Sequence, residues 1–497
     1  QCIEIAEKEH RALWLAFLDI KGAYDSVNQE DLWGILDTLN VEDGVINLLK
    51  EIYKSNKVVI KWERQESEPI EIQRGLRQGC PLSPLLFMLY LQGLEAKLER
   101  SGLGFNISFR RQGKYVEQLL PALMYADDIV LMAGNKQDLQ ALMDICGKVG
   151  DELGFKFSKE KSAVMVFNDN EGGEHRIQEV TLEIVDKYKY LGVWISSGIE
   201  YLREHEKYIS TKGNRNAAVM KKRALWNYNR YEVVRGIWKG VMVPGLTFGN
   251  AVLCMRPEVQ ARLEIKQRGV GRLALGAHGN TPNQGVKGDM GWTSFEGREA
   301  SSKIEFEERL REMGDERWAR KVFSYLYMRN VDTKWRKRTR KLSSKYLDNS
   351  RIPSKKESSV KKKVKETERD MWKLWMLTKS ALETYRTFKQ DIAKVNIYDN
   401  SRGSSLLFEA RMGVLRAKVY RARYEGTDTL CSACGEEEET AEHLILFCKG
   451  LHPVVQGNEA EFFKALGFRD SEGRIDIKRV EKTKRRLSDR WLKSRQE

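Results

Sequence analysis

Two short apolar runs around a pair of adjacent carboxylates constrain this chain more than any other stretch. Residues 123–126 lead into Asp127 and Asp128, and the apolar residues 129–131 follow at once. Runs this short and this close predict two strands joined by a tight hairpin. Burying both arms would hold two mutually repelling carboxylates at the hairpin tip. A divalent cation such as Mg²⁺ is one reason to hold them there. The alternative is that Asp-Asp simply favours a turn.

The charge of the chain indicates a polyanionic partner. Its 497 residues carry 86 lysines and arginines against 71 acidic residues, a formal charge of +15. This length predicts several domains, and the basic excess favours nucleic acid first and an anionic membrane surface second. No apolar run approaches the ~18 residues of a membrane span. Seven cysteines, spread widely apart from a C-terminal cluster, favour a reducing intracellular compartment.

A further carboxylate and a glycine-rich loop lie upstream of the hairpin. Residues 13–18 form an apolar run that ends at Asp19, which predicts a buried strand with a carboxylate at its end, or an ordinary strand-end turn residue. Asn28 is placed to cap the helix that follows. Residues 74–84 form a Gly/Pro loop, in which Gln78 would be unusual unless its amide has a partner. Ser83 followed by Pro84 predicts the next N-cap and first helical residue.

The segment after the hairpin alternates between helix and strand. Apolar residues at helical spacing from Leu139 to Cys146 predict a helix, and residues 163–167 and 188–195 predict strands. Lys161 precedes the first of these strands. It is a candidate general acid or phosphate contact, or a solvated lysine with no such role.

From about residue 200 the pattern changes to long amphipathic helices. One helical face could stack on bases and track phosphates, although aromatic residues in such a pattern are more often core. It comprises Trp226, Arg230, Tyr231, Arg235 and Trp238. A dense basic run between Lys334 and Lys365 contains serines and Pro353, which predicts a flexible linker. This linker is either simply solvated or a sequence-independent phosphate clamp, and the two interpretations are compatible.

The C-terminal cysteines form a metal-binding pattern. Two residues separate Cys431 from Cys434, eight separate Cys434 from His443, and four separate His443 from Cys448. Three thiols and one imidazole fit the tetrahedral ligand set of a structural zinc ion. No ligand position looks open, so we expect the zinc to hold structure and not to catalyse.

The order of these features resembles the polymerase domain of reverse transcriptases, specifically those of non-LTR (LINE-type) retrotransposons. The motifs carrying the resemblance cover about residues 11–195 and run FLDIKGAYD at 17–25, GLRQGCPLSP at 75–84, YADD at 125–128, Lys161-Ser162, and YLG at 190–192. The helical region to about residue 330 and the zinc knuckle are similar to the thumb and C-terminal segment of this family.

The resemblance implies an α+β fold. We expect a right-hand polymerase palm, an antiparallel sheet with packed helices, then a helical thumb and a small helical zinc-knuckle region. The expected domains are a palm with partial fingers at 1–198, a thumb at 199–330, a basic linker at 331–370, and a C-terminal helical segment at 371–497 with its knuckle at 431–448.

The resemblance also implies two-metal-ion nucleotide addition. Asp19 and Asp127 would bridge two Mg²⁺ ions with help from Asp128, and Lys161 would protonate pyrophosphate. Tyr24 would block a ribose 2′-hydroxyl and so favour deoxynucleotides over the substrates of an RNA-dependent RNA polymerase. The remaining expected substrate contacts are Ile20, through its backbone carbonyl, and Gln78, Gly79, Tyr125, Ala126, Tyr190, Leu191 and Gly192.

The expected function is therefore RNA-directed DNA polymerisation in target-primed reverse transcription. Its partners would be an RNA template, a DNA primer or target and dNTPs, with no membrane, and its compartments the nucleus and cytoplasm. Upstream fingers and an endonuclease are not found in this sequence, so we expect a fragment or a truncated copy. The alternative function is a catalytically incompetent nucleic-acid-binding protein.

Overall fold

A computed structural model describes residues 1–54, 57–198, 200–223, 229–347, 359–426, 428–455, 458 and 461–495. The chain forms two compact units. The first comprises Gln1–His205 with Arg309–Lys337, and the second comprises Glu206–Glu308 with Arg338–Glu497. Among the described residues, no helix combines the length and the apolar character needed to cross a membrane. The expected boundaries at residues 198, 330 and 370 stay predictions.

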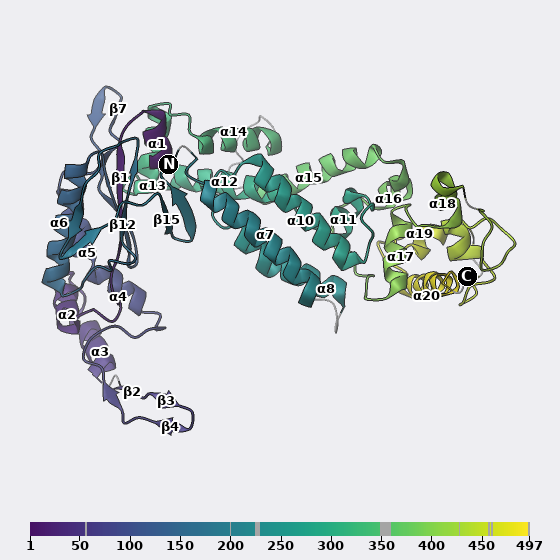
Figure 1. The fold of residues 1–497 in the computed structure, drawn as a ribbon, viewed down its shortest axis with the longest axis horizontal. Coiled ribbons are helices and arrows are strands. Elements are labelled where there is room, and N and C mark those ends of the chain that lie inside the picture. The colour runs from purple at the N-terminus through teal and green to yellow at the C-terminus, as the bar shows by residue number, and fades with distance from the viewer. Residues whose placement is uncertain are drawn as a thin grey trace. The chain divides into compact units, whose positions relative to one another are not determined.

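An antiparallel sheet forms the core of the first unit. Its strands run in the order β10 (Ala122–Tyr125), β11 (Asp128–Ala133), β1 (Leu13–Asp19) and β12 (Ala163–Phe167). The central strand β1 is buried over its apolar length because helix α6 (Lys136–Leu153) covers one face of the sheet (Figure 1). The expected α+β palm architecture, an antiparallel sheet with packed helices, is confirmed.

Side chains alternate across β1, as they must in a strand. Trp14, Ala16 and Leu18 belong to the same buried cluster as the apolar stripe of α6. Phe17 faces the other side, where its ring stacks on Tyr188 at a centroid distance of 4.3 Å. Asp19 lies two residues beyond Phe17, so the strand presents it on the face away from α6.

The predicted start of helix α2 (Gln29–Thr38) is confirmed, whereas that of α4 (Ser83–Tyr90) is shifted. The Asn28 side chain accepts a hydrogen bond from the Glu30 N–H at 3.0 Å. Ser83 is not the N-cap of α4, since Leu82 holds that position. The Ser83 hydroxyl donates to the Arg77 carbonyl at 2.5 Å instead, which closes the loop before the helix.

The single strand predicted over residues 188–195 is wrong, because the segment is a hairpin. Strands β15 (Lys187–Tyr190) and β16 (Val193–Ser196) pair antiparallel around a two-residue loop. The loop residues Leu191 and Gly192 both have positive φ, 45° and 81°. Two consecutive residues with positive φ make a tight reversal that matches strand twist, and apolar alternation alone does not reveal it.

The first unit is completed by short elements around this sheet. They are α1 (Cys2–Lys8), α3 (Asp43–Lys54), β2 (Lys57–Val58), β3 (Lys61–Trp62), β4 (Gln65–Glu66), β5 (Ile70–Glu71), α5 (Gln92–Arg100), β6 (Phe105–Asn106), β7 (Phe109–Arg111), β8 (Lys114–Val116), β9 (Leu119–Leu120), β13 (His175–Ile177), β14 (Val180–Leu182) and α13 (Trp318–Met328).

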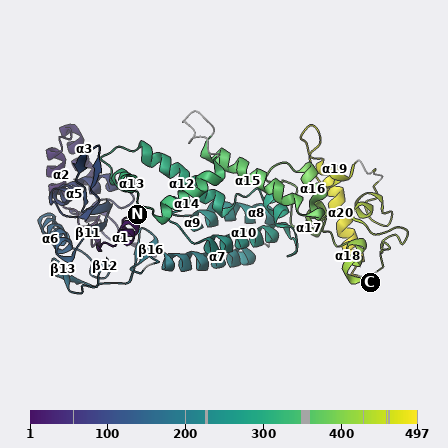
Figure 2. The same cartoon turned by 90° about the horizontal axis from the view of Figure 1, so that it is seen from above.

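The remainder of the described chain is mainly helical, and α7 runs alongside α10 in Figures 1 and 2. Its elements are α7 (Arg203–Arg223), α8 (Arg230–Ile237), the π-helical turn η1 (Trp238–Met242), α9 (Val243–Leu246), α10 (Pro257–Leu275), α11 (Asn283–Met290), α12 (Phe295–Glu312), α14 (Lys334–Tyr346), α15 (Val360–Leu377), η2 (Ser380–Leu382), α16 (Glu383–Phe388), α17 (Arg402–Arg411), α18 (Lys418–Glu425), η3 (His443–Phe447), α19 (Phe462–Ala465) and α20 (Ile477–Lys493).

The aromatic and basic face proposed around α8 is core and not an open nucleic-acid surface. Tyr231 and Trp238 are fully buried. Arg230 donates to the Ala274 carbonyl and Arg235 to the Met290 carbonyl, so both guanidiniums hold the helices together. Trp226, which we placed on the same face, lies outside the described residues.

The flexible linker expected between residues 331 and 370 is wrong for its described parts, which are the helices α14 and α15. Leu342 and Tyr346 of α14 and Val360 and Val364 of α15 are buried in one apolar cluster. These apolar residues recur at helical spacing among the lysines and arginines, and burying them stabilises helix despite the charge. Residues 348–358, with Pro353, lie outside the described residues.

Candidate active site and metal centre

The sheet brings carboxylates from two distant segments together. Asp19 ends β1 and lies directly opposite Asp128, the first residue of β11, in the antiparallel register. Residues directly opposite each other in such a pair have Cβ atoms roughly 4.5–5.5 Å apart. Asp127 precedes Asp128 in the loop of the β10–β11 hairpin, where Ala126 has a φ of 54°, uncommon for a residue with a Cβ. All three predicted carboxylates therefore meet at one end of the sheet.

The chain leaves this carboxylate cluster short of positive charge. Burial raises the pKa of Asp128, and the charges of Asp127 and Asp19 raise it further, against the opposing effect of Lys161. The Asp19 Oδ2 atom is buried, and the exposed Lys161 ammonium pairs with it at an Nζ–Oδ2 distance of 3.3 Å. Mutually repelling hard oxygen ligands gathered at one point fit a divalent cation of the Mg²⁺ type.

A loop before β12 fixes Asp19 and Lys161. The Ser158 N–H donates to the Asp19 carbonyl at 2.8 Å, and the Asp19 N–H donates to the Ser162 hydroxyl at 3.1 Å. The Tyr188 hydroxyl donates to the Lys161 carbonyl at 2.6 Å. The Lys161 side chain itself is 70% exposed. Its backbone is thus anchored while its ammonium can move.

The two tyrosines of β15, Tyr188 and Tyr190, pack against Phe17 close to the carboxylates. Tyr188 stacks on Phe17, and the Tyr190 ring lies 5.4 Å from the same ring. Burial and the charges of Asp128 and Asp19 raise the pKa of Tyr188 to about 12. Burial, with Asp128, also raises the pKa of Tyr190. The sequence resemblance drew attention to Tyr190, whereas the role of Tyr188 emerged only from the fold.

The segment after Asp19 is tied to the glycine-rich loop. Ile20 is buried and pairs with Phe157 in an isolated bridge. The Leu76 N–H donates to the Tyr24 carbonyl at 2.8 Å, and the Tyr24 ring stacks on Phe87 at 5.1 Å. Gly75 has a φ of 97°, and a Cβ there would lie 3.0 Å from the Asp25 Cα, so the close approach of the two segments requires glycine.

The predicted partner for the Gln78 amide exists within the protein. Its Nε2 donates to both carboxylate oxygens of Asp25, at 3.1 and 3.3 Å. Gly79 has a φ of 84° and open space where a Cβ would stand. Asp25 is within the first sequence motif, but only the structure shows that it orients Gln78.

The other predicted contacts lie on the two hairpin tips. Tyr125 is 67% exposed, and Ala126 forms the turn after it. Leu191 is exposed at the β15–β16 turn with Gly192 beside it. These residues are accessible to a ligand, and their assignment as substrate contacts stays a prediction.

The predicted zinc ligands also come together. One ligand atom from each of Cys431, Cys434, His443 and Cys448 lies within 4.8 Å of all the others. The Cys431 and Cys448 Sγ atoms are 3.8 Å apart, and the Cys434 Sγ lies 3.4 Å from the His443 Nε2. Three thiols and one imidazole nitrogen in this arrangement fit a structural zinc ion.

A second layer of side chains supports these ligands. The Glu437 carboxylate lies 2.6 Å from the His443 Nδ1, which leaves Nε2 directed at the thiols. Partnership of a carboxylate with the distal ring nitrogen is typical of zinc-bound histidine. The metal-ligand spacing alone does not single out Glu437, although the glutamate run between Cys434 and His443 is a signal for it.

Helix α20 closes the zinc-ligand cluster through a buried guanidinium. Arg486 is fully buried and donates to four backbone carbonyls around the knuckle. Its acceptors, at 2.8–3.2 Å, are Leu444, Cys448, Leu451 and Pro453. The C-terminal helix is therefore part of the fold of the knuckle.

Comparison with known proteins agrees with this site. The family described as "Reverse transcriptase (RNA-dependent DNA polymerase)" matches residues 1–195. A retrovirus-related Pol polyprotein from the type-1 retrotransposable element R2 of Nasonia vitripennis is 29% identical over 208 residues, which are 39% of this chain and 19% of that protein. The polyprotein from R2DM of Drosophila melanogaster is 26% identical over 201 residues, covering 38% of this chain and 18% of that protein.

The matches thus span about a fifth of the length of these relatives. Among solved structures, telomerase from Candida albicans is similar with a TM-score of 0.34 and 13% identity, covering 80% of this chain and 54% of that one. Telomerase from Candida tropicalis gives a TM-score of 0.30 and 11% identity, covering 65% and 50%.

The carboxylates at the sheet end and the family match together define residues 1–195 as a reverse transcriptase domain. Within that class, the domain is similar to those of the R2 retrotransposable elements. The resemblance stated from the sequence is confirmed.

Proposed function

We propose that this protein is an RNA-directed DNA polymerase of a non-LTR retrotransposon that extends a DNA primer on an RNA template in target-primed reverse transcription. The observation that carries the proposal is the meeting of Asp19, Asp127 and Asp128 at one end of the sheet. The alternative interpretation is that Asp127 and Asp128 only favour a turn. It does not explain why a third carboxylate, Asp19, lies directly opposite Asp128.

Asp19, Asp127 and Asp128 would hold two Mg²⁺ ions, with the backbone carbonyl of Ile20 as a further ligand. When bound, such ions lower the pKa of a primer 3′-hydroxyl and neutralise charge on the leaving pyrophosphate. Bound cations would relieve the mutual repulsion of these carboxylates, which Lys161 offsets only in part.

Lys161 is the proposed proton donor to pyrophosphate. Its backbone is fixed by Tyr188, and its Nζ lies beside Asp19 on an exposed side chain. An ammonium placed in this way can leave the carboxylate for a phosphate that enters the site. The exposed side chain supports a mobile role.

Tyr24, Gln78 and Gly79 are proposed to select and seat the nucleotide. Stacking on Phe87 holds the Tyr24 ring in place, which suits a steric block against a 2′-hydroxyl. Because Asp25 engages the Gln78 amide nitrogen, the amide oxygen stays available as an acceptor. The open space at Gly79 allows a base or backbone to approach closely.

The two hairpin tips are proposed to hold the primer end. Tyr125 and Ala126 stand on the tip that carries Asp127, and Tyr190, Leu191 and Gly192 form the neighbouring turn region. An exposed tyrosine offers both a ring face and a hydroxyl to a nucleotide.

One structural zinc ion in the C-terminal cluster completes the proposed cofactors. The proposed partners are template RNA, primer or target DNA and dNTPs, in keeping with the charge of +15. We place the protein inside the cell, in nucleus and cytoplasm. Among the described residues, which include all seven cysteines, no disulfide is formed, and this suits a reducing compartment.

Primer extension on an RNA template with Mg²⁺ tests the proposed function. Asp127→Asn should lower extension by a factor on the order of 10³, because a metal ligand is lost. Asp37→Asn, which changes an exposed carboxylate of α2, is the matched control and should extend normally. Full extension by Asp127→Asn would refute the assignment. Salt-dependent RNA binding by a folded wild-type protein that never extends would instead support the binding-only alternative.

Nucleotide selection gives a second, independent readout of the same site. Tyr24→Ala should admit ribonucleotides, whereas the wild type should discriminate against them. The measurement is the ratio of ribonucleotide to deoxynucleotide incorporation. Equal use of both by the wild type would favour an RNA-dependent RNA polymerase.

A further inference from the structure

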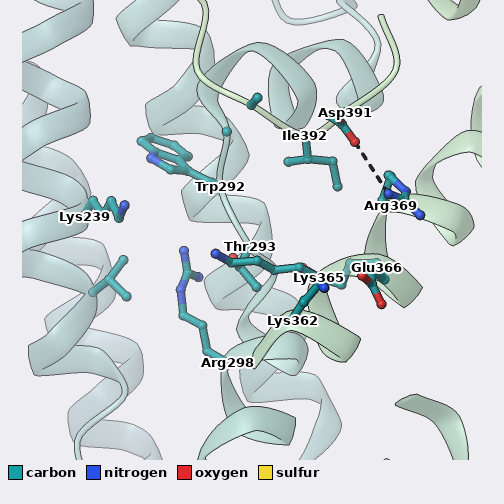
Figure 3. A pocket seen from close by; sticks show the side chains of 14 residues that line it. Lys239, Trp292, Thr293, Arg298, Lys362, Lys365, Glu366, Arg369, Asp391 and Ile392 are labelled. Atoms are coloured by element: carbon teal, nitrogen blue, oxygen red, sulfur yellow. Dashed lines mark ion pairs between the residues drawn. The ribbon is translucent and has the colours of Figure 1, made fainter. Parts of the chain in front are cut away.

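A basic pocket in the second unit has no part in the site described above. Its volume is about 550 Å³, and Figure 3 shows its labelled side chains. Lys239 comes from η1, Arg298 from α12, and Lys362 and Lys365 from α15. We propose that this pocket binds the phosphate group of a nucleotide, on a single nucleic-acid strand or free.

The charges that line the pocket are not balanced. Of its carboxylates, Asp391 pairs with Arg369 at 3.8 Å (Figure 3), and buried Glu368 pairs with Lys287 at 3.2 Å. Glu366 also lines the pocket, and the charges of Glu264 and Glu368 act on Arg298. Within the described part of the chain, no ion pair engages the remaining cations, which are Lys239, Lys362, Lys365 and Arg298. The excess of positive charge favours an anion.

The guanidinium of Arg298 is fixed in position by neighbouring side chains and keeps donors for such a ligand. Its Nη1 donates to the Gln267 Oε1 at 3.0 Å, and its guanidinium lies over the Phe295 ring at 5.0 Å. Gln267 is itself fixed by the Trp238 ring N–H at 3.3 Å. A guanidinium carries five N–H donors, and this one uses a single donor within the described chain. The spare donors match the oxygens of a phosphate.

The arrangement of the backbone around the pocket is also unusual. Lys239 lies on the π-helical turn η1, and turns of this kind are rare and occur often at functional sites. Lys362 and Lys365 are three residues apart on α15 and so share a helix face. The cations thus converge from three separate elements. Lysines that are merely solvated would need only the exposed face of one helix.

The pocket is larger than a bare phosphate needs. Its volume lies within the range of small-molecule sites, roughly 300–1,000 Å³. Trp292, Val243 and Ile392 supply an apolar part of the wall. The Trp292 ring N–H is buried and has no acceptor among the described residues. A nucleotide, with a charged phosphate and an apolar base face, suits this combination of walls.

The source of the phosphate follows from the proposed function, on which this part of the inference rests. A polymerase of this type handles single strands, so we expect a strand and not a free nucleotide. Phosphate binding in this pocket requires no catalysis, however. Loss of phosphate binding in the pocket and loss of primer extension at the carboxylate cluster can therefore be observed independently.

Fluorine NMR of the full-length, zinc-loaded protein labelled with 5-fluorotryptophan provides a local test. The Trp292 resonance is assigned as the one missing from Trp292→Phe. We expect inorganic phosphate, added at constant ionic strength against chloride, to shift this resonance. The double variant K239A/K365A should weaken the response about tenfold, since charged hydrogen bonds are lost. Lys379→Ala, an exposed lysine outside the pocket, is the control and should respond as the wild type does.

Separate arms identify the source. AMP and a 12-nucleotide single-stranded RNA are each titrated in place of phosphate. For the RNA, Lys239→Ala should reduce the slope of log affinity against log salt by about 0.7, the contribution of one phosphate contact on a single strand. Lys379→Ala should leave the slope unchanged. A response to AMP but not to RNA would support the pocket and assign a free nucleotide.

The inference is overturned if the Trp292 resonance stays still with phosphate, AMP and RNA, or if K239A/K365A and Lys379→Ala respond alike. Asp127→Asn should show the full Trp292 response even though it does not extend a primer. Loss of that response in Asp127→Asn would also contradict the inference.

Discussion

The two ligand clusters of this protein differ in how the chain treats its own ligands. At the carboxylate cluster of the first unit, burial and then the neighbouring charges raise the pKa of Asp128, and the buried Asp19 Oδ2 is paired with the exposed Lys161 ammonium. At the zinc-ligand cluster of the second unit, Glu437 supports His443 and Arg486 closes the surrounding backbone. In a structural metal site, protein groups support every ligand. In a catalytic metal site, the charges of the ligands stay unbalanced until metal ions and substrate bind.

The largest expected effect is at the zinc-ligand cluster. Cys431→Ser, or a zinc chelator, should unfold the C-terminal knuckle, because structural zinc contributes on the order of 10 kcal/mol to the folding of small zinc domains. Limited proteolysis with and without added zinc measures the loss. Cys80→Ser, at a thiol outside the cluster, should resist protease as the wild type does. Equal resistance of Cys431→Ser would show that the cluster needs no metal.

The next effect tests the closure by helix α20. Arg486→Ala should destabilise the C-terminal segment by about 3 kcal/mol, because four buried carbonyls lose a charged donor. Denaturant unfolding measures this change. The neighbouring Arg485 is exposed, and Arg485→Ala should stay within about 0.5 kcal/mol of the wild type. A similar loss of unfolding free energy in both variants would mean that the positive charge of the helix, and not the buried hydrogen bonds of Arg486, stabilises the segment.

A smaller effect is expected from the carboxylate behind the zinc histidine. Glu437→Gln should weaken zinc binding roughly 10- to 100-fold, the usual cost of losing such a partner. Competition with a chromophoric chelator measures the affinity. Glu436→Gln removes the adjacent exposed carboxylate and should bind zinc normally. An unchanged affinity in Glu437→Gln would remove the carboxylate from the account of the site.

The smallest effect has the opposite sign and lies in the carboxylate cluster. Without Mg²⁺, Asp128→Asn should stabilise the first unit by roughly 0.5–1 kcal/mol, since solvent screens these partly exposed charges. The folded-state pKa of Asp128 lies above the ordinary value of 3.8. The unfolded chain therefore loses this proton first, and wild-type stability should fall as pH rises through that interval.

Thermal unfolding at several pH values, with and without Mg²⁺, measures this effect. Asp128→Asn should flatten the pH dependence and respond less to Mg²⁺ than the wild type. Asp37→Asn should change neither property. Destabilisation of Asp128→Asn in the absence of Mg²⁺ would show that the carboxylates are not held against their mutual repulsion.

Much of the first unit could be predicted locally. The hairpin around Asp127 and Asp128, the cap at Asn28 and the strand ending at Asp19 follow from patterns only a few residues long. Such patterns reflect interactions between near neighbours, which a short segment contains in full. The flexible linker was wrongly predicted because the local pattern of the basic run shows only its charge. The burial of Leu342 and Val364 depends on partners outside that run.

By itself, the sequence determined the order of the motifs, the α+β class of the first unit and which three thiols and one imidazole form the C-terminal cluster. Only the tertiary structure decided that Asp19 stands opposite Asp128, that Asp25 orients Gln78, and that Arg486 closes the knuckle. Strand register and buried contacts join residues tens to hundreds of positions apart. They are set by the packing of the whole core, and no short stretch of sequence contains the information that fixes them.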